Sequence, residues 1–299
     1  MWLVLAFVSA LLLGFYDAFK KQSLKDNAVL PVLFLNTVFS SLVFLPFIIV
    51  SHLSPETLQD TVFMVPEAGW EAHKYILLKS FIVLSSWILG YFGMKHLPLT
   101  IVGPINATRP VMVLIGALLL FGERLNLYQW IGVSLAILSF FMLSLSGKKE
   151  GIDFRHNKWI ACIVLAAVMG AVSGLYDKYL MTRLNPMLVQ SWYNVYQVGI
   201  MCPIIALLWW PNRKNSTTFR WKWTIVCISL FLCAADFAYF YSLSLEGSMI
   251  SIVSMVRRGS VVVSFLFGAL VFREKNLKSK VIDLILVLIG MFFLYLGSE

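Results

Sequence analysis

Ten nearly uninterrupted apolar stretches make up most of the chain of 299 residues and limit what it can fold into. A helix needs about 20 apolar residues to cross about 30 Å of hydrocarbon, and each stretch is close to that length. We therefore predict an all-α membrane protein with ten transmembrane helices. The stretches are residues 2–24, 30–51, 75–95, 99–121, 127–146, 159–181, 187–210, 223–245, 249–272 and 280–297.

The composition argues against a soluble protein and against several functions. Only 13% of the residues are charged, against about 25% in soluble proteins. The net charge of +9 comes mostly from short connections between the apolar stretches, which indicates membrane topology and not nucleic-acid binding. The cysteines form no CxxC pair and the histidines are scattered, so we expect no metal site. No phosphate-binding loop, HExxH or GxSxG motif occurs, so we expect no cofactor and no enzyme.

A short motif in the first apolar stretch recurs in the sixth. The sequence Gly-Phe-Tyr-Asp at Gly14–Asp17 corresponds to Gly-Leu-Tyr-Asp at Gly174–Asp177. Glu123, after the fourth stretch, corresponds in the same way to Glu274, after the ninth. These correspondences indicate a tandem duplication of five spans.

The predicted duplication divides the chain into a first five-helix repeat at 1–146, a linker at 147–158 and a second five-helix repeat at 159–299. Because each repeat has an odd number of spans, the second repeat enters the membrane from the opposite side, and the two are inverted. Inverted repeats are typical of secondary transporters, which use them for alternating access to a central site.

The distribution of basic residues predicts the orientation. Lysine and arginine are concentrated in the connections after the odd-numbered apolar stretches. The positive-inside rule makes those connections cytoplasmic and places both termini outside. We expect a multi-pass protein of the cell (inner) membrane that is surrounded by lipid, and a homodimer is compatible with the sequence.

Three arginines lie near the middle of apolar stretches. Arg109 is in the fourth, and Arg257 and Arg258 are in the ninth. An arginine at the centre of a membrane helix costs about 2.5–3.5 kcal/mol, so something must compensate for it. Pro104 and Pro110 bracket Arg109 and predict a kink or break there. Because the guanidinium fork matches carboxylate and phosphate oxygens, we predict that the two stretches face each other across an anion-binding site.

Three aspartates could balance these arginines. Asp236, in the middle of the eighth stretch, is the best candidate for an internal counter-ion. Asp17 and Asp177 lie nearer helix ends, where Lys20 and Lys178 could pair with them locally. Either of these two aspartates could instead act as a counter-ion or take part in coupling.

Further polar side chains could line the same cavity. Amides and phenols orient a solute without adding charge, although hydrogen bonding between helices would equally account for them. Tyr16 and Tyr176 are candidates because the repeat relates them. With these two, the uncharged candidates for substrate binding are Asn36, Asn106, Gln190 and Asn194.

The sequence Phe-Gly-Glu-Arg-Leu at 121–125, together with ten spans and a five-plus-five repeat, resembles the EamA-type branch of the drug/metabolite transporter superfamily. The resemblance covers the whole chain. It implies that spans one to four and six to nine line a central cavity, and that Glu123 and Glu274 cap the helices that follow them. It also implies cytoplasmic termini, against the charge rule. The corresponding turn after the ninth stretch, at residues 272–275, keeps the glutamate but lacks the family's usual glycine. Central arginines are also more frequent here than in typical members of the family.

Taken together, these features predict a secondary transporter or exchanger of a small organic anion, either a phosphorylated or a carboxylated metabolite. Arg109 and Arg258 would bind the anionic group, with Arg257 as a further candidate. One alternative is an exporter of amino acids or amphipathic drugs in which the arginines are bridged internally. Another is a flippase for a lipid-linked intermediate.

Overall fold

The structure is a computed structural model that describes residues 1–96, 105, 109–145, 158–214, 217–260, 263 and 277–297. These residues form ten α-helices and no strand, and one helix lies in each predicted apolar stretch. The helices are α1 (Trp2–Leu24), α2 (Val29–Leu53), α3 (Trp70–His96), α5 (Arg109–Leu120), α6 (Leu127–Leu145), α7 (Lys158–Met181), α8 (Pro186–Ile204), α9 (Thr224–Ser244), α10 (Ile250–Arg258) and α12 (Leu277–Leu296). Asn106, Pro104, Glu274 and residues 147–157 of the predicted linker lie outside the described residues.

Within the described part of the chain, six helices are long and apolar enough to cross a membrane. These are α1, α2, α3, α7, α9, and α8 together with the π-helix η3 (Ile205–Trp209) that continues it. α5 is a shorter apolar helix that begins at Arg109, directly before Pro110. The presence of ten crossings remains a prediction.

Local sequence explains how α8 begins and ends. Asn185 accepts hydrogen bonds from the backbone N–H groups of Met187 and Leu188 at 2.8 and 3.3 Å, and Pro186 occupies the first turn. A capping asparagine followed by proline is a favourable start for a helix. Near the other end, Pro203 has no N–H to donate, and the helix continues as η3 with wider turns.

The helix contacts come in matched sets. α1 packs most extensively on α9, and α3 packs on α7; α1 also contacts α10, and α7 contacts α5. The repeat pairs α1 with α7, α2 with α8, α3 with α9, α5 with α10, and α6 with α12. Replacing both helices of a contact by their counterparts converts α1–α9 into α3–α7, and α1–α10 into α5–α7. The self-matched pairs α2–α8, α5–α10 and α6–α12 are also in contact. A pseudo-twofold relation between the halves produces such a pattern.

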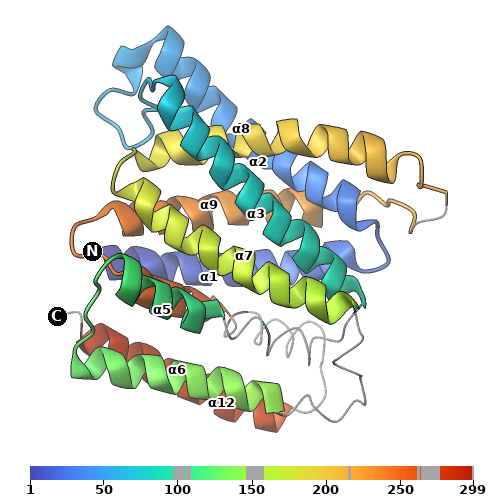
Figure 1. Cartoon of the computed structure of the whole chain (residues 1–299). Helices are drawn as coiled ribbons and strands as arrows, with labels where there is room; N and C mark the ends of the chain where they lie inside the picture. The colour runs from blue at the N-terminus through green and yellow to red at the C-terminus, as the bar shows by residue number, and fades with distance from the viewer. Residues whose placement is uncertain are drawn as a thin grey trace.

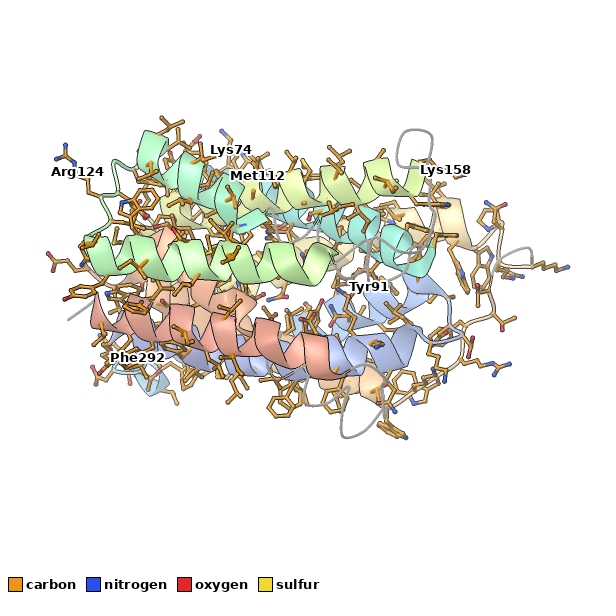
Figure 2. The ribbon with its side chains drawn as sticks, turned by 90° about the horizontal axis from the view of Figure 1, so that it is seen from below. Lys74, Tyr91, Met112, Arg124, Lys158 and Phe292 are labelled. Carbon is orange, nitrogen blue, oxygen red and sulfur yellow. The ribbon has the colours of Figure 1, made fainter. Side chains whose placement is uncertain are left out.

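The start of α1 and the end of α12 lie at the same end of the bundle, with α6 and α12 along one edge (Figure 1). In the view from below, Arg124 and Lys158 lie at opposite ends (Figure 2). α5 and α10 contact each other between the edge pair α6–α12 and the remaining helices. A central cavity lies where these two helices meet α1, α3, α7 and α9.

A methyl group on Gly132 tests the packing of α6 on α12. A Cβ there would lie 2.7 Å from the Gly290 carbonyl oxygen and 2.8 Å from Leu294 Cγ. Overpacking of this kind costs about 1–3 kcal/mol, so Gly132→Ala should lower the midpoint of thermal unfolding of the detergent-purified protein. Gly199 in α8 is the matched control, because a Cβ there meets no atom of the described residues within 4 Å. If Gly132→Ala were as stable as Gly199→Ala, the close approach of the two helices would be contradicted.

Candidate functional site

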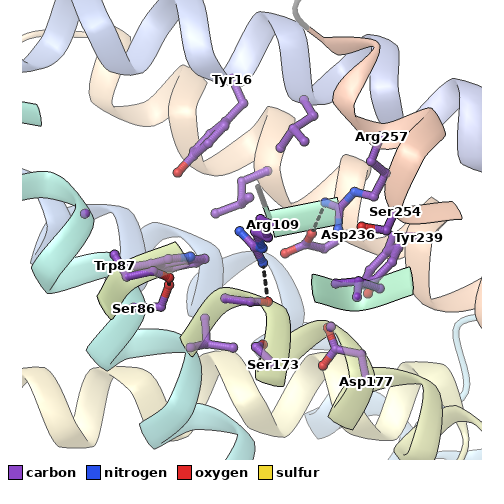
Figure 3. A pocket seen from close by; sticks show the side chains of 18 of the residues that line it. Tyr16, Ser86, Trp87, Arg109, Ser173, Asp177, Asp236, Tyr239, Ser254 and Arg257 are labelled. Carbon is purple, nitrogen blue, oxygen red and sulfur yellow. Dashed lines mark hydrogen bonds and ion pairs between the residues drawn. The ribbon is translucent and has the colours of Figure 1, made fainter. Parts of the chain in front are cut away.

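A polar cavity of about 210 Å³ lies at the centre of the bundle, which is many times the space that one water molecule needs. Figure 3 shows its lining side chains converging from several helices. Five lining side chains are cationic and three are carboxylates, so the formal charge of the lining is +2. The charged residues are Asp17, Lys20, Lys79, Arg109, Asp177, Asp236, Arg257 and Arg258.

Arg109 enters the cavity from the first residue of α5. Its Nη2 donates a hydrogen bond of 2.7 Å to the carbonyl oxygen of Gly170 in α7 (Figure 3). A Cβ at Gly170 would lie 2.5 Å from the guanidinium carbon, so only glycine permits this approach. The carbonyl contributes a partial negative charge but leaves most guanidinium donors available. Within the described residues, Arg109 forms no ion pair with a carboxylate.

Arg257 is compensated internally. Its Nη2 donates to Asp236 Oδ1 at 2.8 Å, and its guanidinium carbon lies 4.0 Å from the centroid of the Tyr239 ring (Figure 3). The Tyr193 hydroxyl donates to the other carboxylate oxygen of Asp236 at 3.4 Å. Asp236 is thus the internal counter-ion of Arg257. The Nε of Arg257 has no hydrogen-bond partner in the described structure.

Arg258 ends α10 and lines the cavity without an ion pair or side-chain hydrogen bond to any described residue. Asp17 is in the same situation on α1. The expected local ion pair between Asp17 and Lys20 does not form. The Lys20 ammonium lies instead 4.1 Å from the centroid of the Tyr91 ring and 5.2 Å from that of Tyr16, and the two hydroxyls are hydrogen-bonded at 3.3 Å. An aromatic face attracts a cation without neutralising its charge.

Lys79 of α3 is the main site residue that sequence reasoning missed. Only 2% of its surface is exposed, and it forms an ion pair with the buried Asp177 of α7. The rings of Tyr193 and Phe240 lie 4.8 and 4.7 Å from its ammonium. Lys79 lies inside the apolar stretch 75–95, and that position was the available signal in the sequence.

The expected pairing of Asp177 with Lys178 is wrong. Neighbouring residues of a helix point about 100° apart, and Lys178 turns away from the cavity. Its ammonium donates at 2.6 Å to both the carbonyl and the hydroxyl oxygen of Ser248, beyond the end of α9.

The uncharged candidates separate into two groups. Tyr16 lines the cavity, whereas Asn36, Gln190, Asn194 and Tyr176 do not. Asn36 accepts a bond from Ser229 at 3.1 Å, Gln190 donates to the Cys233 carbonyl at 2.8 Å, Asn194 donates to the Gln190 carbonyl at 2.7 Å, and Tyr176 donates to the Tyr75 carbonyl at 3.2 Å. These four side chains thus form hydrogen bonds within or between helices. Aromatic lining residues absent from our candidates are Trp87, Tyr91, Tyr239 and Phe240.

Comparison with known proteins decides the family. The sequence model of the EamA-like transporter family matches residues 1–145 and again residues 157–296. The chain belongs to the EamA-like transporter family. It is therefore an integral, multi-pass membrane protein that transports small molecules, and the resemblance predicted from the sequence is confirmed.

Solved structures support the fold of this EamA-like transporter. One crystal structure of a protein superposes with a TM-score of 0.73 at 13% sequence identity, covering 99% of this chain and 97% of the other. In total, 28 chains of known structure are similar. No curated protein sequence matches significantly.

The Lys79–Asp177 pair gives a test of the buried charges in this transporter. Lys79→Met leaves an uncompensated buried carboxylate and should cost about 3–5 kcal/mol of unfolding free energy, as should Asp177→Leu through an unpaired ammonium. The double variant removes both charges and should recover most of the loss. Thermal unfolding of the purified variants measures this. Additive losses in the double variant would show that the two residues are not coupled.

Proposed function

We propose that this EamA-like transporter is a secondary transporter or exchanger of a small organic anion, and that a phosphorylated or carboxylated metabolite binds in the central cavity. The observation that carries the proposal is the excess of positive charge among the lining residues. Lys79 and Arg257 have carboxylate partners, whereas Lys20, Arg109 and Arg258 face a single carboxylate, that of Asp17. The remaining formal charge of +2 matches a dianion, such as a phosphate monoester or a dicarboxylate.

The geometry of the two arginines supports recognition of oxygen anions. Arg109 projects from the start of α5 and Arg258 from the end of α10, two helices in contact with each other. Guanidinium groups offer several donors in a plane and bind carboxylate or phosphate with two parallel hydrogen bonds. In a cavity of low dielectric constant, such charge-assisted bonds are stronger than in water.

We further propose alternating access between two inverted five-helix repeats, at 1–146 and 159–299. The double match of one family model and the matched helix contacts support this architecture. Rocking one repeat against the other would expose the cavity to each side of the membrane in turn. The anion would then replace the missing countercharge during the crossing.

A second candidate function is the export of zwitterionic amino acids. It is favoured by Asp17, whose carboxylate lines the cavity without a described partner and could bind a substrate ammonium group. Within the described part of the chain, the internal bridging of all the arginines that we considered for an exporter applies to Arg257 alone among the three.

Replacement of Arg258 by glutamine tests the proposed function. Loss of one charge-assisted interaction, worth about 1.5–3 kcal/mol, should weaken anion binding by about 10- to 100-fold. Binding of phosphate monoesters and dicarboxylates to the purified protein, and their uptake into proteoliposomes, measure the effect. Arg124→Gln is the matched control, because Arg124 is exposed at the end of the bundle. Anion binding that survives Arg258→Gln unchanged would contradict the proposal.

Replacement of Asp17 by asparagine separates the two candidate functions. Two like charges in a cavity repel each other by up to about 4 kcal/mol at an effective dielectric constant of about 20, so removing this one should strengthen dianion binding about tenfold or more. A zwitterion would lose its ammonium partner and bind more weakly. Asp60→Asn, at an exposed position, is the control. Weaker binding of amino acids in Asp17→Asn, without stronger binding of dianions, would favour the zwitterion.

A further inference from the structure

Glu123, in the turn between α5 and α6, bonds to the first residues of α10 in the other half of the chain. One carboxylate oxygen accepts from the backbone N–H of Ile250 at 2.7 Å. The other accepts from the N–H of Ser251 at 3.2 Å and from the Ser251 hydroxyl. The first N–H groups of a helix lack partners within the helix, and a negative charge there is favourable. Met249, at the N-cap position, provides no side-chain bond.

The family resemblance implies that Glu123 caps the helix that follows it, and the structure shows otherwise. α6 has its own cap, formed by two residues that are three positions apart. Asn126 accepts from the N–H of Gln129 at 2.9 Å, and Gln129 accepts from the N–H of Asn126 at 3.0 Å. This reciprocal arrangement is equivalent to a capping box, so Glu123 is not needed to cap α6. Its carboxylate is therefore committed to α10.

The position of this contact connects it to the cavity. α10 has nine residues, about 13 Å at 1.5 Å per residue. Glu123 holds the first residues of the helix, and Arg257 and Arg258 are its last two. Along α5 the order is reversed, because Arg109 comes first and Glu123 follows the end of the helix. The carboxylate thus joins the two arginine-bearing helices at the ends away from their arginines.

A hydrogen bond within the second half of the chain also holds the segment that leads into α10. Lys178 of α7 donates to the carbonyl and hydroxyl oxygens of Ser248, two residues before α10. That bond lies within one half of the chain, whereas the bond of Glu123 crosses between the halves. Lys178 therefore provides an internal comparison for any effect of Glu123.

We propose that Glu123 is the positioning residue of α10. By capping this helix from the first half of the chain, it determines where Arg257 and Arg258 stand relative to Arg109, and so sets the geometry of the binding site across the two halves. The inference about the arginines rests on the proposed function, whereas the capping of α10 by Glu123 does not depend on it.

The reactivity of a buried cysteine on α10 tests the proposal without any ligand. Val253 is fully buried, and Val253→Cys is introduced after the four native cysteines have been replaced by serine. In Glu123→Gln, reaction of this cysteine with a hydrophilic maleimide should become at least tenfold faster. Arg124→Gln should leave the rate within about twofold. Lys178→Met should raise it less than Glu123→Gln, since the cap remains.

A second reporter separates positioning from general stability. Val189 in α8 is equally buried, and Val189→Cys should react at an unchanged rate in Glu123→Gln. Two results in Glu123→Gln would overturn the proposal: an unchanged rate at Val253→Cys, or equal acceleration at Val253→Cys and Val189→Cys. Acceleration at Val253→Cys in Lys178→Met equal to that in Glu123→Gln would also overturn it. If Glu123→Gln does not fold, Ser251→Ala removes only the hydroxyl contact and should give a smaller acceleration at Val253→Cys; no acceleration there would overturn the proposal.

Binding of glucose 6-phosphate and succinate then tests the consequence for the site. In Glu123→Gln, the dissociation constant of whichever probe binds the wild type should rise about tenfold. If neither probe binds the wild type, the anion proposal fails while the cysteine rates still decide the role of Glu123. If binding is unchanged although Val253→Cys reacts faster, Glu123 holds α10 without positioning the arginines, and the proposal is overturned.

Discussion

A charge inside a membrane must be compensated, and this requirement organises the centre of the protein. Lys79 is matched by Asp177, and Arg257 by Asp236 and the ring of Tyr239. Arg109 relies on the carbonyl of Gly170, which is reachable because that residue has no side chain. Each solution needs a partner on another helix, so the charges specify how α3, α5, α7, α9 and α10 meet. The positive charge that these partners leave uncompensated lies in the cavity, and we propose that an anionic substrate supplies the countercharge.

The two halves have similar helix contacts but different charge chemistry. Asp17 and Asp177 occupy corresponding positions of the repeated motif. Asp177 is buried against Lys79, whereas Asp17 lines the cavity without a described partner. One copy of the motif has become part of the internal ion-pair framework, and the other remains available to the cavity. A duplicated architecture can therefore carry a binding site that is not itself symmetric.

Much of this arrangement could be predicted from the sequence because it depends on local properties. Apolar length located the ten helices of the described residues, and the cost of a buried guanidinium identified Arg109, Arg257 and Arg258 as residues of one site. The partners could not be predicted, since Lys79 and Asp177 are 98 residues apart and meet only through the packing of α3 on α7. Asn36, Gln190 and Asn194 illustrate a second limit, since the sequence left two roles open for them. A polar residue on a membrane helix can face a cavity or another helix, and the sequence does not distinguish the two.

The central claim is that the cavity selects ligands for negative charge. A thermal-shift experiment on the purified protein with ligand pairs that differ in one charged group tests it most directly. Glucose is compared with glucose 6-phosphate, and succinamide with succinate. The account predicts that the charged member of at least one pair raises the unfolding temperature, while neither neutral member does. Equal stabilisation by both members of a pair, or stabilisation by neutral or cationic ligands alone, would contradict it.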